Sequence, residues 1–160
     1  MQRLVGYINR LAEVAAVVAF ATLITVVSAA VFWRYVLNDS VVWAEELSRY
    51  CFIWVTFLGG GLGVGKNIHV GVDSLVMLLP QQPRKIVEVG VEIAIVIFLI
   101  TLIAVGVQFM QFGMNSRALM LQIPMGYVYA AVPAGALVML ANVLLNLQRH
   151  VREVLKGEAS

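Results

Sequence analysis

The segment WAEELSRYCFIWVTFLGGGLGVGKNIHV, residues Trp43–Val70, decides how this chain folds. Two adjacent carboxylates, Glu45 and Glu46, and a cation, Arg49, lead directly into sixteen residues without a charge. Basic side chains close this run, at Lys66 and His69. Charged groups at the mouth of an apolar helix of membrane length are costly unless something other than lipid satisfies them. The segment therefore predicts a membrane-spanning helix that also carries an assembly surface.

The composition of the whole chain predicts a membrane protein. Of its 160 residues, 61% are hydrophobic and 12% are charged, whereas a soluble domain carries about 25% charged residues. The length leaves room for one membrane domain over residues 1–160 and for no soluble domain beside it. A scattered net charge of +2 argues against nucleic acid as a partner. The lone cysteine, Cys51, lies in an apolar run and has no internal disulfide partner.

Charge-free runs predict an all-α integral membrane fold with four transmembrane helices. The expected spans cover residues of about 12–33, 42–64, 84–110 and 124–147. In the first span, residues 14–33 are uncharged, which is enough to cross roughly 30 Å of hydrocarbon. This run is longer than the roughly 7–15 residues of a signal peptide, so we expect an uncleaved helix. Pro133 and Gly135 are expected to kink the fourth span.

The connection between the second and third spans contains a short apolar segment. Residues 68–79 read IHVGVDSLVMLL, which is too short to cross a membrane. Most of its residues are apolar, whereas Asp73 and Ser74 are polar, which favours a short helix lying at the membrane surface. A plain loop is the alternative interpretation.

The distribution of lysine and arginine predicts the orientation. With four spans, eight basic residues share a side with both termini: Arg3, Arg10, Lys66, Arg84, Lys85, Arg149, Arg152 and Lys156. The other side holds three, Arg34, Arg49 and Arg117. Because basic residues accumulate in cytoplasmic segments, both termini are expected in the cytoplasm. Lys66, His69, Arg84 and Lys85 are then expected at the cytoplasmic membrane surface.

Helical winding of residues 43–65 separates two faces. One is aromatic and consists of Trp43, Leu47, Tyr50, Trp54, Phe57 and Gly61. The opposite face is polar and small, with Glu45, Arg49, Thr56, Gly59 and Gly63. The spacing of the last two glycines permits close helix approach, which predicts a packing seam, although glycine is also simply common in membrane helices.

Charged side chains near this helix have two possible arrangements. Glu45 precedes Arg49 by four residues, the favourable order for a pair on one helix. Arg34 follows the first span and either snorkels to the interface or pairs with Glu45 or Glu46. Asn142 and Asn146, near the end of the fourth span, either hydrogen-bond another helix or meet water. No metal-ligand cluster, nucleophile–base arrangement or phosphate loop is present in the sequence, so we expect no enzyme activity and no cofactor.

The stretch FWRYVLNDSVVWAEELSRYCFIWVTFLGG, residues Phe32–Gly60, carries a family resemblance. Its order is an aromatic-Arg-Tyr helix end, a Trp-x-Glu-Glu helix start, Arg49, Trp54 and then Phe57-Leu58-Gly59. Lys66, His69-Val70 and Leu79-Pro80 follow. In size, spans and these motifs, the chain resembles the small membrane subunit of tripartite ATP-independent periplasmic (TRAP) transporters, the DctQ family.

This resemblance implies a function and partners. Such subunits associate with a large membrane subunit of the DctM type, which holds the substrate and sodium sites. A periplasmic binding protein delivers an organic acid such as a C4-dicarboxylate or sialic acid. The small subunit then acts as a scaffold in the bacterial inner membrane, in contact with lipid. Two alternatives are a self-sufficient homodimeric transporter, for which Glu13 is a weak candidate carboxylate, and a structural subunit of another membrane complex.

Overall fold

The computed structural model describes residues 2–39, 41–65 and 81–157. Its helices are α1 (Gln2–Val36), α2 (Val42–Gly65), α4 (Gln81–Gly113), α5 (Gly126–Tyr129) and α6 (Ala131–Gly157). The described residues contain four helices long and apolar enough to cross a membrane. This confirms the predicted all-α membrane fold. The expected surface helix at residues 68–79, together with Lys66 and His69, lies outside the described residues.

The ends of the helices follow from local backbone chemistry. After α1 ends at Val36, Asn38 takes a φ of 52°, a left-handed conformation that asparagine tolerates better than most residues. The break between α5 and α6 falls at Ala130. Pro133 has no N–H to donate to the carbonyl four residues earlier, at Tyr129, which weakens the helix at that point. The fourth predicted span is therefore two helices.

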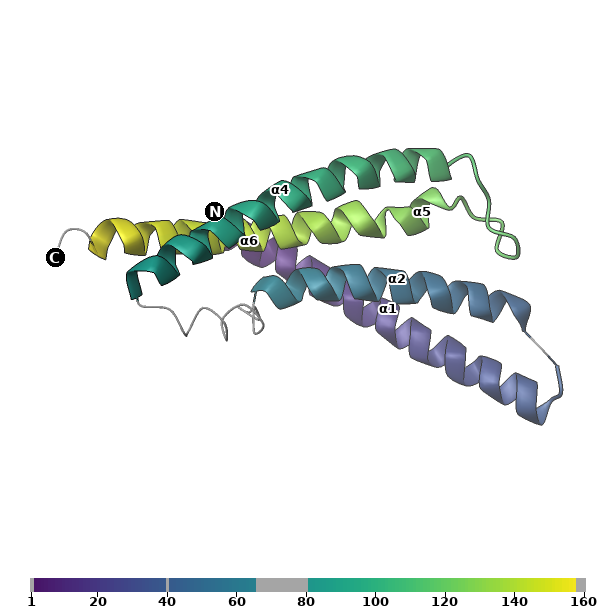
Figure 1. Ribbon diagram of the computed structural model, residues 1–160. Helices are drawn as coiled ribbons and strands as arrows, with labels where there is room; N and C mark the ends of the chain where they lie inside the picture. Colours follow the sequence, from purple (N-terminus) through teal and green to yellow (C-terminus); the bar gives the residue numbers. More distant parts are fainter. Residues whose placement is uncertain (1, 40, 66–80, 158–160) are drawn as a thin grey trace.

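The helices form a bundle in which α6 is central. It packs against α2 and α4 and, over a shorter length, against α1, while α1 lies along α2 (Figure 1). We call the end with the α1–α2 connection and residues 114–125 the loop end, and the opposite end, toward the chain termini, the terminal end. The α1 and α2 axes diverge toward the loop end (Figure 1).

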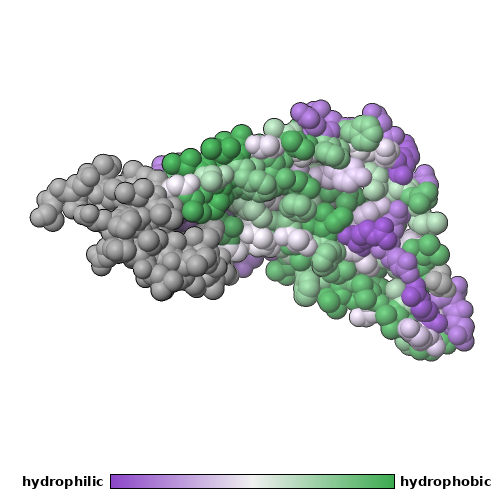
Figure 2. All heavy atoms as spheres, in the orientation of Figure 1, coloured by the Kyte–Doolittle hydropathy of each residue, from purple (hydrophilic) through white to green (hydrophobic). Residues whose placement is uncertain are grey.

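Side chains from neighbouring helices form small apolar clusters. One joins Ala12, Leu58 and Val138, from α1, α2 and α6. Another joins α4 to α6 and is built on Leu99, Ala136 and Val143. Much of the outer surface is apolar as well. Figure 2 shows apolar side chains over the middle of the visible face and polar ones gathered at the loop end, the distribution that a bilayer requires.

Two glycines allow α2 and α6 to approach closely. A Cβ atom on Gly135 would lie 2.5 Å from the carbonyl oxygen of Phe57, and one on Gly61 would lie 3.0 Å from Val138. By contrast, a Cβ on Gly59 or Gly63 would meet nothing within 4 Å. The α2–α6 seam therefore uses Gly61 and Gly135, whereas Gly59 and Gly63 leave open space beside them among the described residues.

Substituting these glycines should change stability in opposite directions. Gly135→Ala should destabilise the chain by about 1–3 kcal/mol, because a new methyl group would overlap the α2 backbone. Gly59→Ala is the matched control. It should be neutral or stabilising by up to about 1 kcal/mol, because alanine favours a helix and has open space here. Thermal unfolding of both variants in detergent, followed by circular dichroism, measures the difference. Equal melting temperatures would contradict this account of the seam.

Candidate assembly site at the loop end

The adjacent carboxylates at the start of α2 bind two different elements. Glu45 forms an ion pair with Arg34 at the end of α1. Of the two arrangements considered for Arg34, the structure thus has the pairing across the α1–α2 connection. The alternative pair of Glu45 with Arg49 is absent, and within the described part of the chain Arg49 makes no ion pair. Because both Arg34 and Glu45 are exposed, their attraction fixes geometry more than it adds stability.

Glu46 binds the loop that connects α4 to α5. Its carboxylate accepts backbone N–H groups from Leu119 at 3.1 Å, Met120 at 3.0 Å and Leu121 at 2.9 Å. It also accepts the hydroxyl of Tyr50, one helical turn further along α2, at 2.8 Å. A carboxylate is acceptor-only and has several lone pairs, so one side chain can satisfy all of these donors. We call this set of bonds the Glu46 latch.

The loop presents its N–H groups because of its own hydrogen bonds. Arg117 and Pro124 form an antiparallel bridge, and the N–H of Ala118 donates to the carbonyl of Ile123 at 2.9 Å. At the turn, Gln122 has a φ of 54°, and its amide donates to the Leu119 carbonyl at 2.8 Å. Successive N–H groups in such a turn point to one side and form an anion-binding concavity. Glu46 fills that concavity.

Sequence reasoning identified Glu46 but not what it binds. The expected partner was a side chain, Arg34, which instead pairs with Glu45. The groups that Glu46 binds are backbone amides. Every non-proline residue carries one, so the identity of a residue does not indicate which amides will bind a carboxylate. No signal in the sequence of the loop would have identified them.

The aromatic face of α2 points into the bundle. Tyr50 is buried against Ala118 and Val128, and its hydroxyl also contacts the Met125 sulfur at 3.3 Å. Trp54 packs on the cluster that joins α1, α2 and α6. Trp43, at the start of the helix, is exposed. Apart from Trp43, the aromatic stripe is thus used within the chain.

The opposite face of α2 is left uncovered. We call it the α2 outer face and define it by Arg49, Phe52, Thr56, Gly59 and Gly63. Its side chains are exposed, with Gly63 partly so. The Thr56 hydroxyl donates to the Phe52 carbonyl at 2.8 Å and so needs no external partner. The exposed cation and the two open glycines remain without a counterpart among the described residues.

Two of the predicted membrane-surface residues, Arg84 and Lys85, lie at the terminal end. They are near the start of α4, about 43 Å of helix away from its other end by the rise per residue. They are therefore separate from the charged cluster at the start of α2. Among the described residues, no group of three or more His, Cys, Asp or Glu side chains could hold a metal ion.

The fold defines a multi-pass membrane protein. At its loop end, charged side chains of α2 bind the end of α1 and the loop between α4 and α5. Comparison with known families gives a more specific result. Residues 23–153 match the model of the DctQ component of tripartite ATP-independent periplasmic transporters. The chain belongs to this family, which confirms the resemblance seen in its sequence. Because the family consists of transporter subunits rather than enzymes, the prediction that this chain is not an enzyme is also confirmed.

Three relatives illustrate the match. A Haemophilus influenzae protein named as a candidate TRAP transporter small permease is 32% identical over 160 residues, covering 99% of this chain and 98% of the relative. The C4-dicarboxylate TRAP transporter small permease protein DctQ of Rhodobacter capsulatus is 32% identical, over 62% of this chain and 45% of the relative. The sialic acid TRAP transporter permease protein SiaT of Haemophilus influenzae is 27% identical, over 84% of this chain but 22% of its own length.

Replacing Glu46 should release the loop from the start of α2. In Glu46→Gln one oxygen becomes an NH₂ group, which would face backbone N–H donors and cannot accept them. Hydrogen exchange of the Leu119–Leu121 amides should therefore accelerate, as measured by mass spectrometry of the detergent-solubilised chain. Glu45→Gln is the matched control and should leave those amides protected. Unchanged protection in Glu46→Gln would show that the latch does not hold the loop.

Proposed function

We propose that this chain is the small scaffold subunit of a TRAP-type secondary transporter. It holds a large DctM-type membrane subunit during sodium-coupled uptake of an organic acid that a periplasmic binding protein delivers. Membership of the DctQ family supports this role. The names of relatives support an organic acid as cargo, because they specify sialic acid and C4-dicarboxylates. The observation that carries the scaffold role is the uncovered outer face of α2 with its exposed Arg49.

The alignment with SiaT supports the large subunit as the partner. Most of this chain, 84%, aligns with only 22% of that permease. A region similar to this chain therefore forms part of a longer permease polypeptide. Regions joined in one chain by a relative are good candidates for association when they occur as separate chains. We infer that this protein binds a chain that corresponds to the remainder of SiaT.

The α2 outer face is the surface that we assign to the large subunit. Gly59 and Gly63 would let a partner helix approach the α2 backbone, which is how membrane helices associate closely. Arg49 lies two to four turns from these glycines, at the loop end. A cation at that depth favours an anionic partner, because an arginine in lipid is costly when unpaired. The proposed partner helix thus carries a carboxylate at its corresponding end and apolar or small side chains below it.

The other predicted site residues have an indirect role in this proposal. Arg34, Glu45 and Glu46 hold α2 between α1 and the loop, which sets the direction in which Arg49 points. Trp43 flanks the same surface as an exposed aromatic group. Trp54 contributes by packing inside the chain. The basic residues Lys66, His69, Arg84 and Lys85 remain predicted cytoplasmic-surface residues.

The orientation in the membrane follows from the same basic residues. We propose a bacterial inner-membrane location, with both termini in the cytoplasm and the loop end in the periplasm. The excess of lysine and arginine in the terminal segments and in the 66–85 connection supports this orientation. It places the Glu46 latch on the side where a binding protein would deliver substrate.

Substitutions on the α2 outer face should weaken the complex. Gly59→Leu would fill the space that a partner helix needs, and Arg49→Gln would remove the charge that attracts its carboxylate. Co-purification of the large subunit should fall for both variants, and substrate uptake in vesicles should fall with it. Gly90→Leu is the matched control, because a Cβ on Gly90 of α4 also meets nothing within 4 Å. Full recovery and uptake with both variants would contradict this assignment.

The alternative of a self-sufficient transporter gives a different result. Its candidate carboxylate, Glu13, lies on an exposed part of α1 near the terminal end, whereas a coupling carboxylate belongs in the middle of the membrane. We therefore expect the purified chain, reconstituted alone in liposomes, to move neither sialic acid nor a C4-dicarboxylate. The large subunit, added in the same liposomes with the binding protein and a sodium gradient, should restore uptake. Transport by the chain alone would overturn the scaffold proposal.

A further inference from the structure

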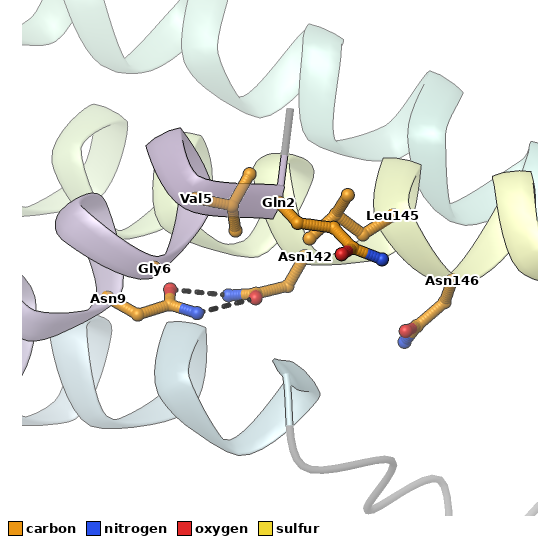
Figure 3. Close-up of a pocket in the computed structure, with 7 residues that line it drawn as sticks. All are labelled: Gln2, Val5, Gly6, Asn9, Asn142, Leu145 and Asn146. Carbon is orange, nitrogen blue, oxygen red and sulfur yellow. Dashed lines mark hydrogen bonds between the residues drawn. The ribbon is translucent and has the colours of Figure 1, made fainter.

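A polar pocket lies at the terminal end, between the first turns of α1 and the second half of α6. Its volume is about 240 Å³, smaller than the roughly 300–1,000 Å³ of sites for drug-sized ligands. Carboxamide and apolar side chains line it (Figure 3): Gln2, Val5, Asn9, Asn142, Leu145 and Asn146. None of the described residues that line the pocket carries a charge. It therefore suits a small uncharged group with several hydrogen-bonding atoms.

One pair of carboxamides forms a fixed wall of the pocket. Asn9 and Asn142 donate to each other at 2.8 and 2.9 Å (Figure 3). The Asn142 amide also donates to the carbonyl oxygens of Val138 at 3.0 Å and Gly61 at 3.3 Å. Asn142 is buried, with 3% of its surface exposed. These bonds join α1, α2 and α6, so the wall is held in place.

The other two carboxamides of the pocket, those of Asn146 and Gln2, make no such hydrogen bonds with described residues. Asn146 is nine-tenths buried, with 9% of its surface exposed, and it makes no hydrogen bond within the described residues. It lines the pocket apart from the Asn9–Asn142 pair (Figure 3). Gln2 lines the same pocket and is likewise free of hydrogen bonds to described residues. Buried polar groups are normally hydrogen-bonded, so Asn146 indicates that the pocket accommodates a polar group from outside the chain.

The chemistry of the lining narrows the class of that group. A carboxamide both donates and accepts, and the described lining residues offer no charge to balance an ion. Neighbouring hydroxyl groups, which also donate and accept, match this lining well. The pocket thus favours a polyol, and a glycerol group has the small size that its volume requires.

Charged and apolar residues also lie beside the pocket. They indicate which chemical groups the ligand carries in addition to its polyol. Arg3 and Arg10 are exposed on α1, one position from Gln2 and Asn9, and neither pairs with a described residue. Leu4, Tyr7 and Leu11 are exposed on the same turns. The 35 residues of α1 extend about 52 Å, well beyond roughly 30 Å of hydrocarbon. Residues 2–11 therefore lie at headgroup depth, where basic side chains meet lipid phosphates.

We propose that this pocket binds the headgroup of an anionic phospholipid with a hydroxylated headgroup, phosphatidylglycerol. The glycerol hydroxyls bind Asn146 and Gln2, and Arg3 and Arg10 attract the phosphate. The site is separate from the α2 outer face, and its existence does not depend on the proposed scaffold function.

Native mass spectrometry of the full chain in mild detergent tests the proposal, with phosphatidylglycerol and phosphatidylethanolamine as probes. The wild-type chain should prefer phosphatidylglycerol. Asn146→Leu should weaken its binding about tenfold, the effect of losing one or two hydrogen bonds. Asn115→Leu, at an exposed carboxamide near the loop end, is the matched control and should bind like the wild type. Arg3→Gln combined with Arg10→Gln should reduce the preference for phosphatidylglycerol, because the net negative charge of this lipid loses its attraction, while the hydroxyl contacts with Asn146 remain.

Other outcomes would overturn the proposal. Equal binding of both lipids by the wild type, or unchanged phosphatidylglycerol binding by Asn146→Leu, would mean that the pocket holds water only. Displacement of the lipid by millimolar glycerol 3-phosphate would assign the site to a soluble ligand instead. Circular dichroism checks that Asn146→Leu folds. If it does not, the double arginine variant decides, because both of its positions are exposed and free of ion pairs with described residues.

Discussion

The arrangement of this bundle depends on one carboxylate that accepts three backbone N–H groups. Glu46 fixes the 114–125 loop to the start of α2, and Tyr50 joins the same carboxylate from one turn below. The neighbouring Glu45 binds the end of α1. Since lipid supplies no attraction between helices comparable to water's hydrophobic effect, such polar contacts at the membrane surface have a large part in choosing which helices adjoin.

The latch also determines which face of α2 is turned outward. Because Tyr50 points toward the loop, the other residues on the aromatic face of α2 also point into the bundle. Trp54, for example, packs near Leu58. The close contact of Gly135 with the Phe57 carbonyl holds the same rotation further along the helix. Arg49 and the open glycines are then on the outside by helical geometry alone. The position of the proposed assembly surface is thus a consequence of internal packing.

The sequence was enough to predict the four apolar helices, because membrane length and charge-free runs are properties of composition. It also gave a pairing of Arg34 with Glu45 or Glu46 as one of two possible arrangements, because opposite charges lie at one membrane surface. It could not tell which face of α2 points inward, because both lipid and protein interior accept apolar side chains. The partners of Glu46 were hidden for another reason, since they are backbone amides. Asn142 and Asn146 were recognised as ambiguous, and the structure separates them: Asn142 bonds other helices, and Asn146 does not.

An exposed arginine alone would be weak support for a partner, because its long side chain can reach the headgroups unaided. The glycines on the same face strengthen the argument. A glycine offers no side chain for contact with lipid. Each glycine in a helix also lowers the stability of the helix by up to about 1 kcal/mol relative to alanine. Gly59 and Gly63 make no close contact with the described residues, so the packing described above does not explain them, as it does Gly61 and Gly135. In the proposed complex, close approach by a helix of the large subunit would offset their cost, and the same approach would bring a carboxylate within reach of Arg49.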